Sequence, residues 1–141
     1  MVYKKESLIK RIEKLKEYGH DLKEMGNISF DVYIKDKKLR YSIERLLFLI
    51  SENILDFLDH VLSSKYKTVS DSYEEIIENA YKRGIIESSI HGNIKGLGGF
   101  RNILAHEYLT LSDDEVFRNL EKIMSLLDTI ISEFEKIIEN Q

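Results

Sequence analysis

Four polar side chains that could take part in chemistry lie close together in the segment 98-GGFRNILAHEYLTL-111, which otherwise reads as a buried helix. They are Arg101, Asn102, His106 and Tyr108. An arginine guanidinium stays charged at any working pH and matches the oxygens of a phosphate. A histidine titrates at about pH 6.5 and can take or give a proton at neutrality. Together they suit the attack of a ribose 2′-hydroxyl on the adjacent phosphate, with His106 moving the proton and Arg101 stabilising the developing charge.

The spacing of these residues on a regular helix decides which of them can meet. Asn102 and His106 are one turn apart, so Asn102 is placed to hold the imidazole in one tautomer. Arg101 and Tyr108 are near two full turns apart on a neighbouring stripe. The five-residue step from Arg101 to His106 puts this pair roughly 140° apart around the axis. We therefore expect the two groups to meet in a cleft between two copies of the helix, most simply in a two-fold dimer.

This chemistry requires no metal ion and no cofactor, and the histidine spacing predicts neither. His91 and His106 would lie roughly 22 Å apart along one continuous helix, too far to share an ion. His20 and His60 have no neighbours at ligand spacing. The absence of cysteine excludes disulfides, thiolate metal sites and a cysteine nucleophile.

Length and composition predict a single domain over residues 1–141. With 43% hydrophobic and 33% charged residues, the chain is typical of a globular protein. No apolar run approaches the roughly 20 residues that cross a membrane, and the start MVYKKESLIKRIEKL lacks the apolar core of a signal peptide. We therefore expect a cytoplasmic protein without a membrane partner. The net charge of −4 gives no global positive field, so any attraction of nucleic acid must be local.

The apolar spacing is helical nearly everywhere, and the sequence contains no proline and no strand pattern. It predicts an all-α up-and-down bundle of five helices. The first ends before Gly26, the second runs from a cap at Ser29 to about residue 62, and the third covers 72–82. The fourth covers about 87–106, and the last starts after Ser112. Ser72 and Ser112 each precede a glutamate by three residues, which indicates capping boxes.

The string from Arg101 to Tyr108, RNILAHEY, resembles the R-x-x-x-x-H-x-Y motif of the HepT-type HEPN toxins. The likeness covers most of the chain. The segment 72-SYEEIIENAYKRGII-86 looks like the short helix and turn of that family, and 96-GLGGFRNILAHEYLTLSDDEVF-117 follows its usual continuation into a last helix. The long helix, with Glu52 and Asp56, sits where the family's dimer-forming helix pair begins.

The resemblance implies a HEPN-like fold that dimerises through helices, and the role of toxin in a type VII-like toxin–antitoxin pair. HepT-like proteins are homodimeric, metal-independent ribonucleases whose two motifs meet in an interhelical cleft. Arg101 and His106 then take the catalytic positions and Asn102 a supporting one. Tyr108 takes the position of the tyrosine that a cognate MntA-type nucleotidyltransferase antitoxin modifies with AMP. The implied partners are a second copy, the antitoxin and an RNA substrate, with no DNA.

Two other interpretations fit the same residues. The chain could be a non-catalytic helical binding module that partners a minimal nucleotidyltransferase. It could also be a structural bundle in which the motif only caps and packs. An adaptor has no need of both Arg101 and His106, which favours the nuclease.

Overall fold

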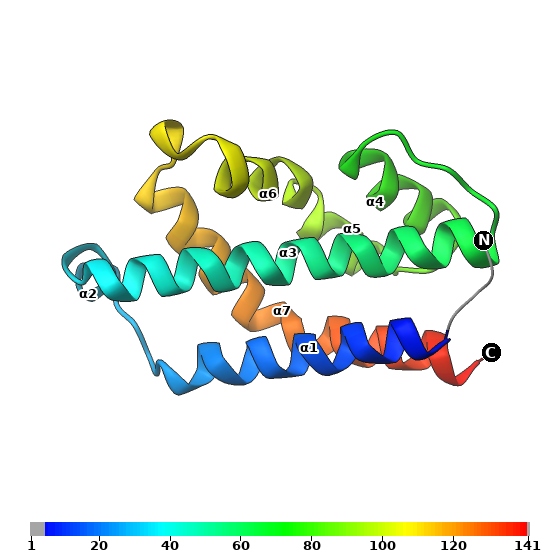
Figure 1. Cartoon of the computed structure of the whole chain (residues 1–141), viewed down its shortest axis with the longest axis horizontal. Helices are drawn as coiled ribbons and strands as arrows, with labels where there is room; N and C mark the ends of the chain where they lie inside the picture. Colours follow the sequence, from blue (N-terminus) through cyan, green and yellow to red (C-terminus); the bar gives the residue numbers. More distant parts are fainter. Residues whose placement is uncertain (1–4, 141) are drawn as a thin grey trace.

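The computed structural model describes residues 5–140, except for the side chain of Tyr108, and this part of the chain is helical without strands (Figure 1). The elements are α1 (Lys5–Glu24), α2 (Phe30–Lys35), α3 (Lys37–Lys65), α4 (Tyr73–Lys82), α5 (Ser88–Ile94), α6 (Leu97–His106), the 3-10 turn η1 (Tyr108–Thr110) and α7 (Asp113–Glu139). The predicted all-α class is confirmed. None of the described helices is long and apolar enough to span a membrane.

The long helix α3 is the centre of the molecule. It packs against α1 and α7 on one side and against α4 and α6 on the other. Figure 1 shows α1 and α3 running in opposite directions, with α7 crossing behind α3 and ending beside the start of α1. Buried apolar side chains along the whole of α3 join these neighbours: Ile43, Leu47, Ile50, Ile54, Leu55, Phe57, Leu58, Val61 and Leu62. The position of α6 is therefore set by its packing on α3.

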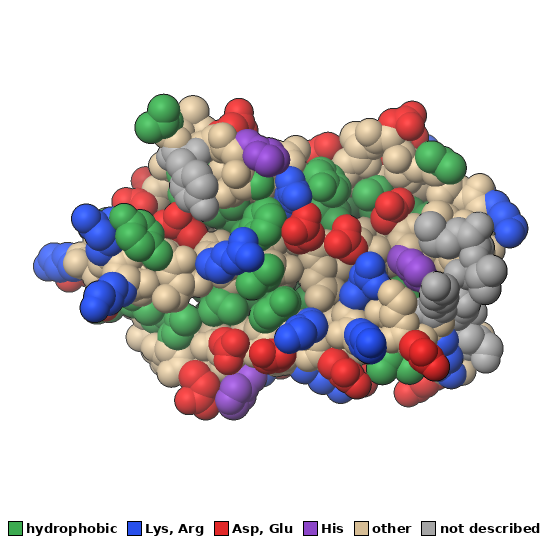
Figure 2. Space-filling view, viewed as in Figure 1, with side chains coloured by type: hydrophobic (Ala, Val, Ile, Leu, Met, Phe, Trp, Pro, Cys, Tyr) green, Lys and Arg blue, Asp and Glu red, His purple; other side chains and the backbone are tan. Residues whose placement is uncertain are grey.

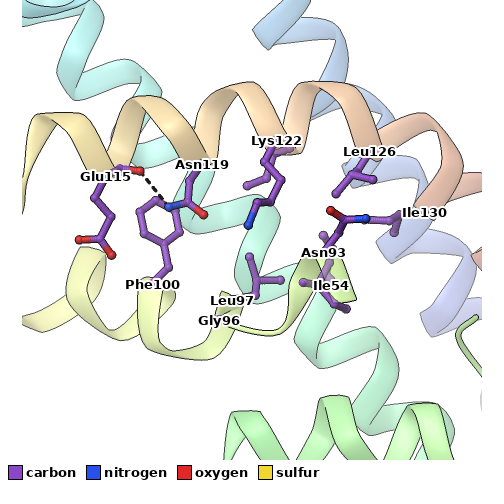
Figure 3. Close-up of a pocket in the computed structure, with 12 residues that line it drawn as sticks. Ile54, Asn93, Gly96, Leu97, Phe100, Glu115, Asn119, Lys122, Leu126 and Ile130 are labelled. Carbon is purple, nitrogen blue, oxygen red and sulfur yellow. Dashed lines mark hydrogen bonds between the residues drawn. The ribbon is translucent and has the colours of Figure 1, made fainter. Parts of the chain in front are cut away.

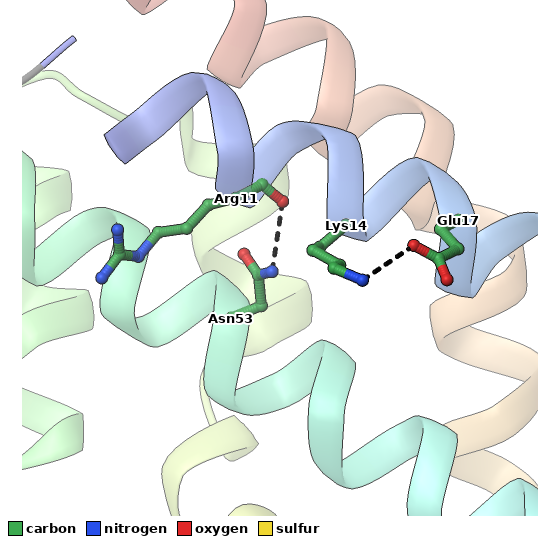
Figure 4. A network of polar contacts seen from close by, with 4 residues as sticks. All are labelled: Arg11, Lys14, Glu17 and Asn53. Carbon is green, nitrogen blue, oxygen red and sulfur yellow. Dashed lines mark hydrogen bonds and ion pairs between the residues drawn. The ribbon is translucent and has the colours of Figure 1, made fainter. Parts of the chain in front are cut away.

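An aromatic stack joins α3 to α7, and a hydrogen bond joins α3 to α1. The rings of Phe57 on α3 and Phe134 on α7 stack at 3.8 Å between centroids. The Asn53 amide donates to the backbone oxygen of Arg11 at 3.1 Å and so links α3 to α1 (Figure 4). The Lys14–Glu17 pair of 3.1 Å in the same view lies on the exposed side of α1.

Two of the five predicted helices are each divided in two. Asp36 ends α2 and caps α3, because its side chain accepts a hydrogen bond from the Leu39 amide at 3.0 Å. The second division falls at Lys95 and Gly96, where Gly96 becomes the N-cap of α6. Apolar periodicity continues across Gly96, from Ile90 and Ile94 to Leu97, which is why it did not reveal the second division. At the first division the four polar residues 35-KDKK-38 do interrupt the apolar stripe.

The predicted N-caps are confirmed, but in the described residues Glu75 accepts from the Asp71 amide at 2.8 Å and not from the Ser72 amide, as a capping box would require. The hydroxyl oxygens of Ser29, Ser72 and Ser112 each accept from a backbone amide three residues on, at 3.2, 3.1 and 3.4 Å. Gly84 follows the end of α4 with a φ of +74°, a left-handed conformation that glycine adopts without strain.

The contact of α4 with α6 depends on the absence of a side chain at Gly98. A Cβ atom at this position would lie 2.4 Å from the Cβ of Tyr73, far inside van der Waals contact. Since Tyr73 is the first residue of α4, glycine here allows the start of α4 to touch the helix that carries Arg101.

We expect Gly98→Ala to destabilise the fold by about 1–3 kcal/mol, the usual cost of an overpacked contact. Gly92→Ala is the matched control, because a Cβ at Gly92 would meet no atom within 4 Å and alanine favours a helix by up to about 1 kcal/mol. Urea denaturation of both variants measures the difference. Equal free energies of unfolding for the two variants would contradict the packing argument.

Candidate functional site

Arg101 lies on the side of α6 that faces α3, and its guanidinium meets a carboxylate there. Arg101 Nη2 donates to Glu52 Oε1 at 2.6 Å. The Arg101 side chain is 14% exposed and that of Glu52 33%. A charge-assisted hydrogen bond of this length in a partly desolvated place is stronger than one between neutral groups. The pair therefore ties α6 to the middle of α3.

The rest of the guanidinium is held by three further side chains. Nη1 donates to Asn102 Oδ1 at 3.2 Å, and the Cζ atom lies over the rings of Phe48 and Tyr73, 5.1 Å from each centroid. The Nε atom is buried without a hydrogen-bond partner among the described residues. Because each terminal nitrogen carries two N–H groups, one on Nη1 and one on Nη2 remain for a ligand.

His106 is the last residue of α6 and is exposed. Within the part of the chain that the structure describes, no hydrogen bond or ion pair reaches it, and none joins it to Arg101. The helix is regular from Leu97 to His106, so the predicted angular separation of the two groups holds. One chain alone offers a guanidinium on one face of α6 and a solvated imidazole at its end.

Asn102 is paired differently from the sequence-based expectation. Its oxygen accepts from Arg101, the adjacent residue, and no hydrogen bond to His106 is found among the described residues. Arginine is long enough to reach round its own helix, whereas the His106 ring at the helix end is open to water. Asn102 is thus placed to orient the guanidinium, and its role toward the imidazole is not seen in this structure.

Tyr108 follows the end of α6 in the 3-10 turn η1, and its side chain lies outside the described residues. Thr110 closes this turn, because its amide and hydroxyl both donate to the Glu107 carbonyl oxygen, at 3.0 and 2.9 Å. Leu109 is fully exposed at 103%. The backbone therefore places residue 108 at the surface end of α6, two positions after His106.

Glu52 is the site residue whose contact sequence reasoning did not identify. The sequence places it, with Asp56, in the helix that resembles the family's dimer helix, but the pattern gives no partner for either. Asp56 lies one turn further along α3, where partial desolvation and the nearby charge of Glu52 raise its pKa. An acidic residue in the middle of a largely apolar helix was the available signal, since such a group needs a partner.

Two hollows lie near α6. One of about 190 Å³ lies between α5, α6 and α7, away from the motif, and has an apolar floor that includes Leu97, Phe100 and Ile130 (Figure 3). The other, of about 390 Å³, is more open and is bordered by Asn102 and the residues 70–74 and 76. The second hollow therefore provides space directly beside the residue that orients the guanidinium.

His91 and His106 lie on different helices, α5 and α6, so the spacing expected for one continuous helix does not apply to them. His91 belongs to α5, where its Nε2 lies 2.6 Å from Glu78 Oε1 and its ring stacks on Tyr81 at 4.1 Å. Its hydrogen bond lowers the pKa of Glu78. Among residues 5–140, no cluster of three or more potential metal ligands is found.

A family model described as Ribonuclease HepT-like matches residues 9–138. The tRNA nuclease HepT of Aphanizomenon flos-aquae (strain 2012/KM1/D3) is 33% identical over 107 residues, which cover 76% of this chain and 73% of that protein. The resemblance inferred from the motif is thereby confirmed at the level of the family.

Two solved structures share the fold. The cytosolic protein of unknown function YutE from Bacillus subtilis matches with a TM-score of 0.84 at 15% identity, over 99% of this chain and 94% of that chain. The tri-AMPylated HEPN toxin of Shewanella oneidensis, in complex with MNT antitoxin, matches with a TM-score of 0.80 at 19% identity, over 92% of this chain and 96% of that chain. The HEPN-like fold expected from the sequence is confirmed by these likenesses.

We expect Glu52→Gln to lower the free energy of unfolding by about 1–2 kcal/mol, because it leaves a partly buried guanidinium without its counter-charge. Glu17→Gln is the control, since Glu17 forms an ion pair of 3.1 Å with Lys14 in which both side chains are more than half exposed and such pairs contribute little. Urea denaturation at neutral pH compares the two variants. An equal effect of both would show that the Glu52 pair is no more than a surface contact.

Proposed function

The chain belongs to the Ribonuclease HepT-like family, and on that basis we propose that it is the toxin of a type VII-like toxin–antitoxin pair, acting in the cytoplasm as a metal-independent endoribonuclease. The observation that carries the proposal is one helix, α6, that presents an oriented guanidinium and a solvated imidazole five residues apart. The proposal is supported by the match of Arg101 and His106 to the R-x-x-x-x-H-x-Y motif that the sequence resembles.

In the proposed reaction His106 takes the proton of a ribose 2′-hydroxyl. The 2′-oxygen bonds to the phosphorus and the bond from phosphorus to the 5′-oxygen breaks, with a proton passing to that leaving oxygen. The free N–H groups on Nη1 and Nη2 of Arg101 bind the phosphate oxygens as their negative charge grows. Asn102 and Glu52 hold the guanidinium in place for this task. The proton-transfer and charge-stabilising roles need no metal ion.

The separation of the two groups around α6 supports a composite site in a homodimer. The outward face of α3 next to the Arg101–Glu52 pair carries apolar side chains: Tyr41 is 59% exposed, and Leu46, Phe48 and Leu49 are partly exposed. Figure 2 shows hydrophobic side chains gathered in the middle of this face. A second copy that covers them would bring its own α6 toward the first, so that Arg101 of one chain can face His106 of the other.

Control by an MntA-type nucleotidyltransferase antitoxin is proposed through Tyr108. The position of residue 108, in a surface turn two residues after His106, supports this assignment. An AMP group on the phenol would bring negative charge and a nucleoside to the end of α6, which repels the RNA phosphate and fills its space.

The activity is tested with purified wild type, Arg101→Ala and His106→Ala incubated with bulk RNA in EDTA. We expect cleavage by wild type and a loss of at least about 100-fold in each variant, because general acid–base catalysis and electrostatic stabilisation of the developing charge each contribute roughly that much. Thermal melts show whether both variants are folded. If wild type does not cut, or His106→Ala cuts equally well, the ribonuclease assignment fails.

Mixing the two inactive variants then tests the composite site. In a mixed dimer one of the two clefts recovers both intact groups, so we expect about a quarter of the wild-type activity after subunit exchange. A site contained within one chain would recover none. Mass measurement under native conditions verifies that mixed dimers have formed.

The modification is tested by incubating the chain with a partner nucleotidyltransferase and ATP and measuring its intact mass. We expect one or more AMP increments on wild type and none on Tyr108→Phe, with RNA cleavage falling as the modified fraction rises. Tyr81→Phe is the control, since the side chain of Tyr81 is 41% exposed. An unchanged wild-type mass, or the same increment on Tyr108→Phe, would reject the assignment of Tyr108.

A further inference from the structure

The guanidinium of Arg101 lies over two aromatic rings that come from different helices. Phe48 projects from α3 and Tyr73 is the first residue of α4, and the Arg101 Cζ atom is 5.1 Å from the centroid of each ring. Both distances are within the range of about 6 Å in which a cation is attracted to the face of a ring. We call Phe48 and Tyr73 the aromatic clamp.

The clamp and the hydrogen bonds restrain different movements of the guanidinium. Glu52 and Asn102 each hold one terminal nitrogen, which limits rotation within the guanidinium plane. Rings over the cation limit its displacement out of that plane and exclude water from around it. The 14% exposure of the side chain and the buried Nε atom without a partner are consequences of this enclosure.

We propose that Phe48 and Tyr73 are positioning residues for the reaction, because they hold Arg101 so that its two remaining N–H groups face the scissile phosphate. This inference rests on the proposed ribonuclease activity. Glu52 alone cannot perform the task, since a single ion pair leaves the guanidinium free to tilt. A misplacement of about 1 Å in a catalytic group can cost on the order of 100-fold in rate.

The clamp also explains why α6 contains Gly98. The Tyr73 ring reaches Arg101 only because α4 begins in contact with α6 at Gly98, where a Cβ atom would lie 2.4 Å from Tyr73 Cβ. The two residues therefore depend on each other: the missing side chain at Gly98 lets Tyr73 approach α6, and the Tyr73 ring then contacts Arg101. The glycine-rich start of α6 thus contributes to the orientation of Arg101, one turn further on.

The inference is tested with Phe48→Leu, Tyr73→Leu and Tyr73→Phe, assayed for kcat and KM on one defined RNA. We expect the two leucine variants to lose about 10- to 100-fold in kcat with little change in KM. Tyr73→Phe should keep near wild-type kcat, because it retains the ring. Tyr66→Leu is the matched control, since Tyr66 packs against other cations, Lys65 at 5.6 Å and Arg83 at 5.8 Å. Wild-type kcat in folded Tyr73→Leu would overturn the proposal.

A double-mutant cycle separates positioning from general stability. In an Arg101→Lys background, the ammonium group is not a planar fork and cannot be oriented in the same way, so Tyr73→Leu should cause little further loss of kcat. An equal loss in both backgrounds would show that Tyr73 acts only through the fold.

A measurement without RNA distinguishes failure of the clamp from failure of the proposed activity. In NMR spectra with 15N-labelled arginine, a clamped guanidinium rotates slowly and gives separate Nη signals for Arg101. We expect separate signals in wild type and Tyr73→Phe and merged signals in Tyr73→Leu, whether or not the chain cleaves RNA. Separate signals in Tyr73→Leu would overturn the clamp, whereas absence of RNA cleavage by wild type would overturn only the proposed function.

Discussion

The site depends on keeping a cationic guanidinium partly out of water, between α6 and the central helix. That is costly unless the charge is compensated, and the Glu52 carboxylate compensates it at 2.6 Å. Much of the local architecture follows from this contact. The long α3 supplies the carboxylate and one ring, α4 supplies the second ring, and Gly98 removes the side chain that would keep α4 away. His106, by contrast, is exposed at the end of α6, as its proposed exchange of a proton with a substrate requires.

The same pairing explains how a chain with a net charge of −4 could act on RNA. Glu52 cancels the long-range field of Arg101, so the site cannot attract a polyanion from a distance. In the proposed reaction, what remains is short-range recognition, in which two fixed N–H groups would match two phosphate oxygens. In such a site, binding of the phosphate depends more on the orientation of the guanidinium than on its net charge. The carboxylate of Glu52, the amide of Asn102 and two aromatic rings together orient the guanidinium of Arg101.

Most of the fold could be predicted from the sequence because apolar periodicity reports directly on burial. Residues of the α3 stripe such as Ile43, Ile54 and Leu62 are buried as expected, and Ser29, Ser72 and Ser112 cap their helices. The division at Gly96 was missed because periodicity runs through it, and the division at Asp36 was missed although 35-KDKK-38 interrupts the stripe. The motif residues were found by their spacing, but their contacts were not. That Asn102 serves Arg101, that Glu52 pairs with Arg101 and that Tyr73 needs Gly98 are consequences of tertiary packing, which local patterns do not encode.

In the proposed site, Arg101, held in this orientation, binds the scissile phosphate, and an imidazole from a second copy takes the proton of the adjacent 2′-hydroxyl. A crystal structure of the dimer with a short RNA blocked by a 2′-O-methyl group at the cleavage position would test it most directly. We expect a phosphate oxygen within hydrogen-bond distance of Nη1 or Nη2 of Arg101, with the Glu52 contact retained, and His106 of the second copy beside the blocked 2′-oxygen. A bound RNA whose phosphates avoid Arg101, or a pair of chains whose α6 helices lie on opposite sides of the dimer, would contradict it.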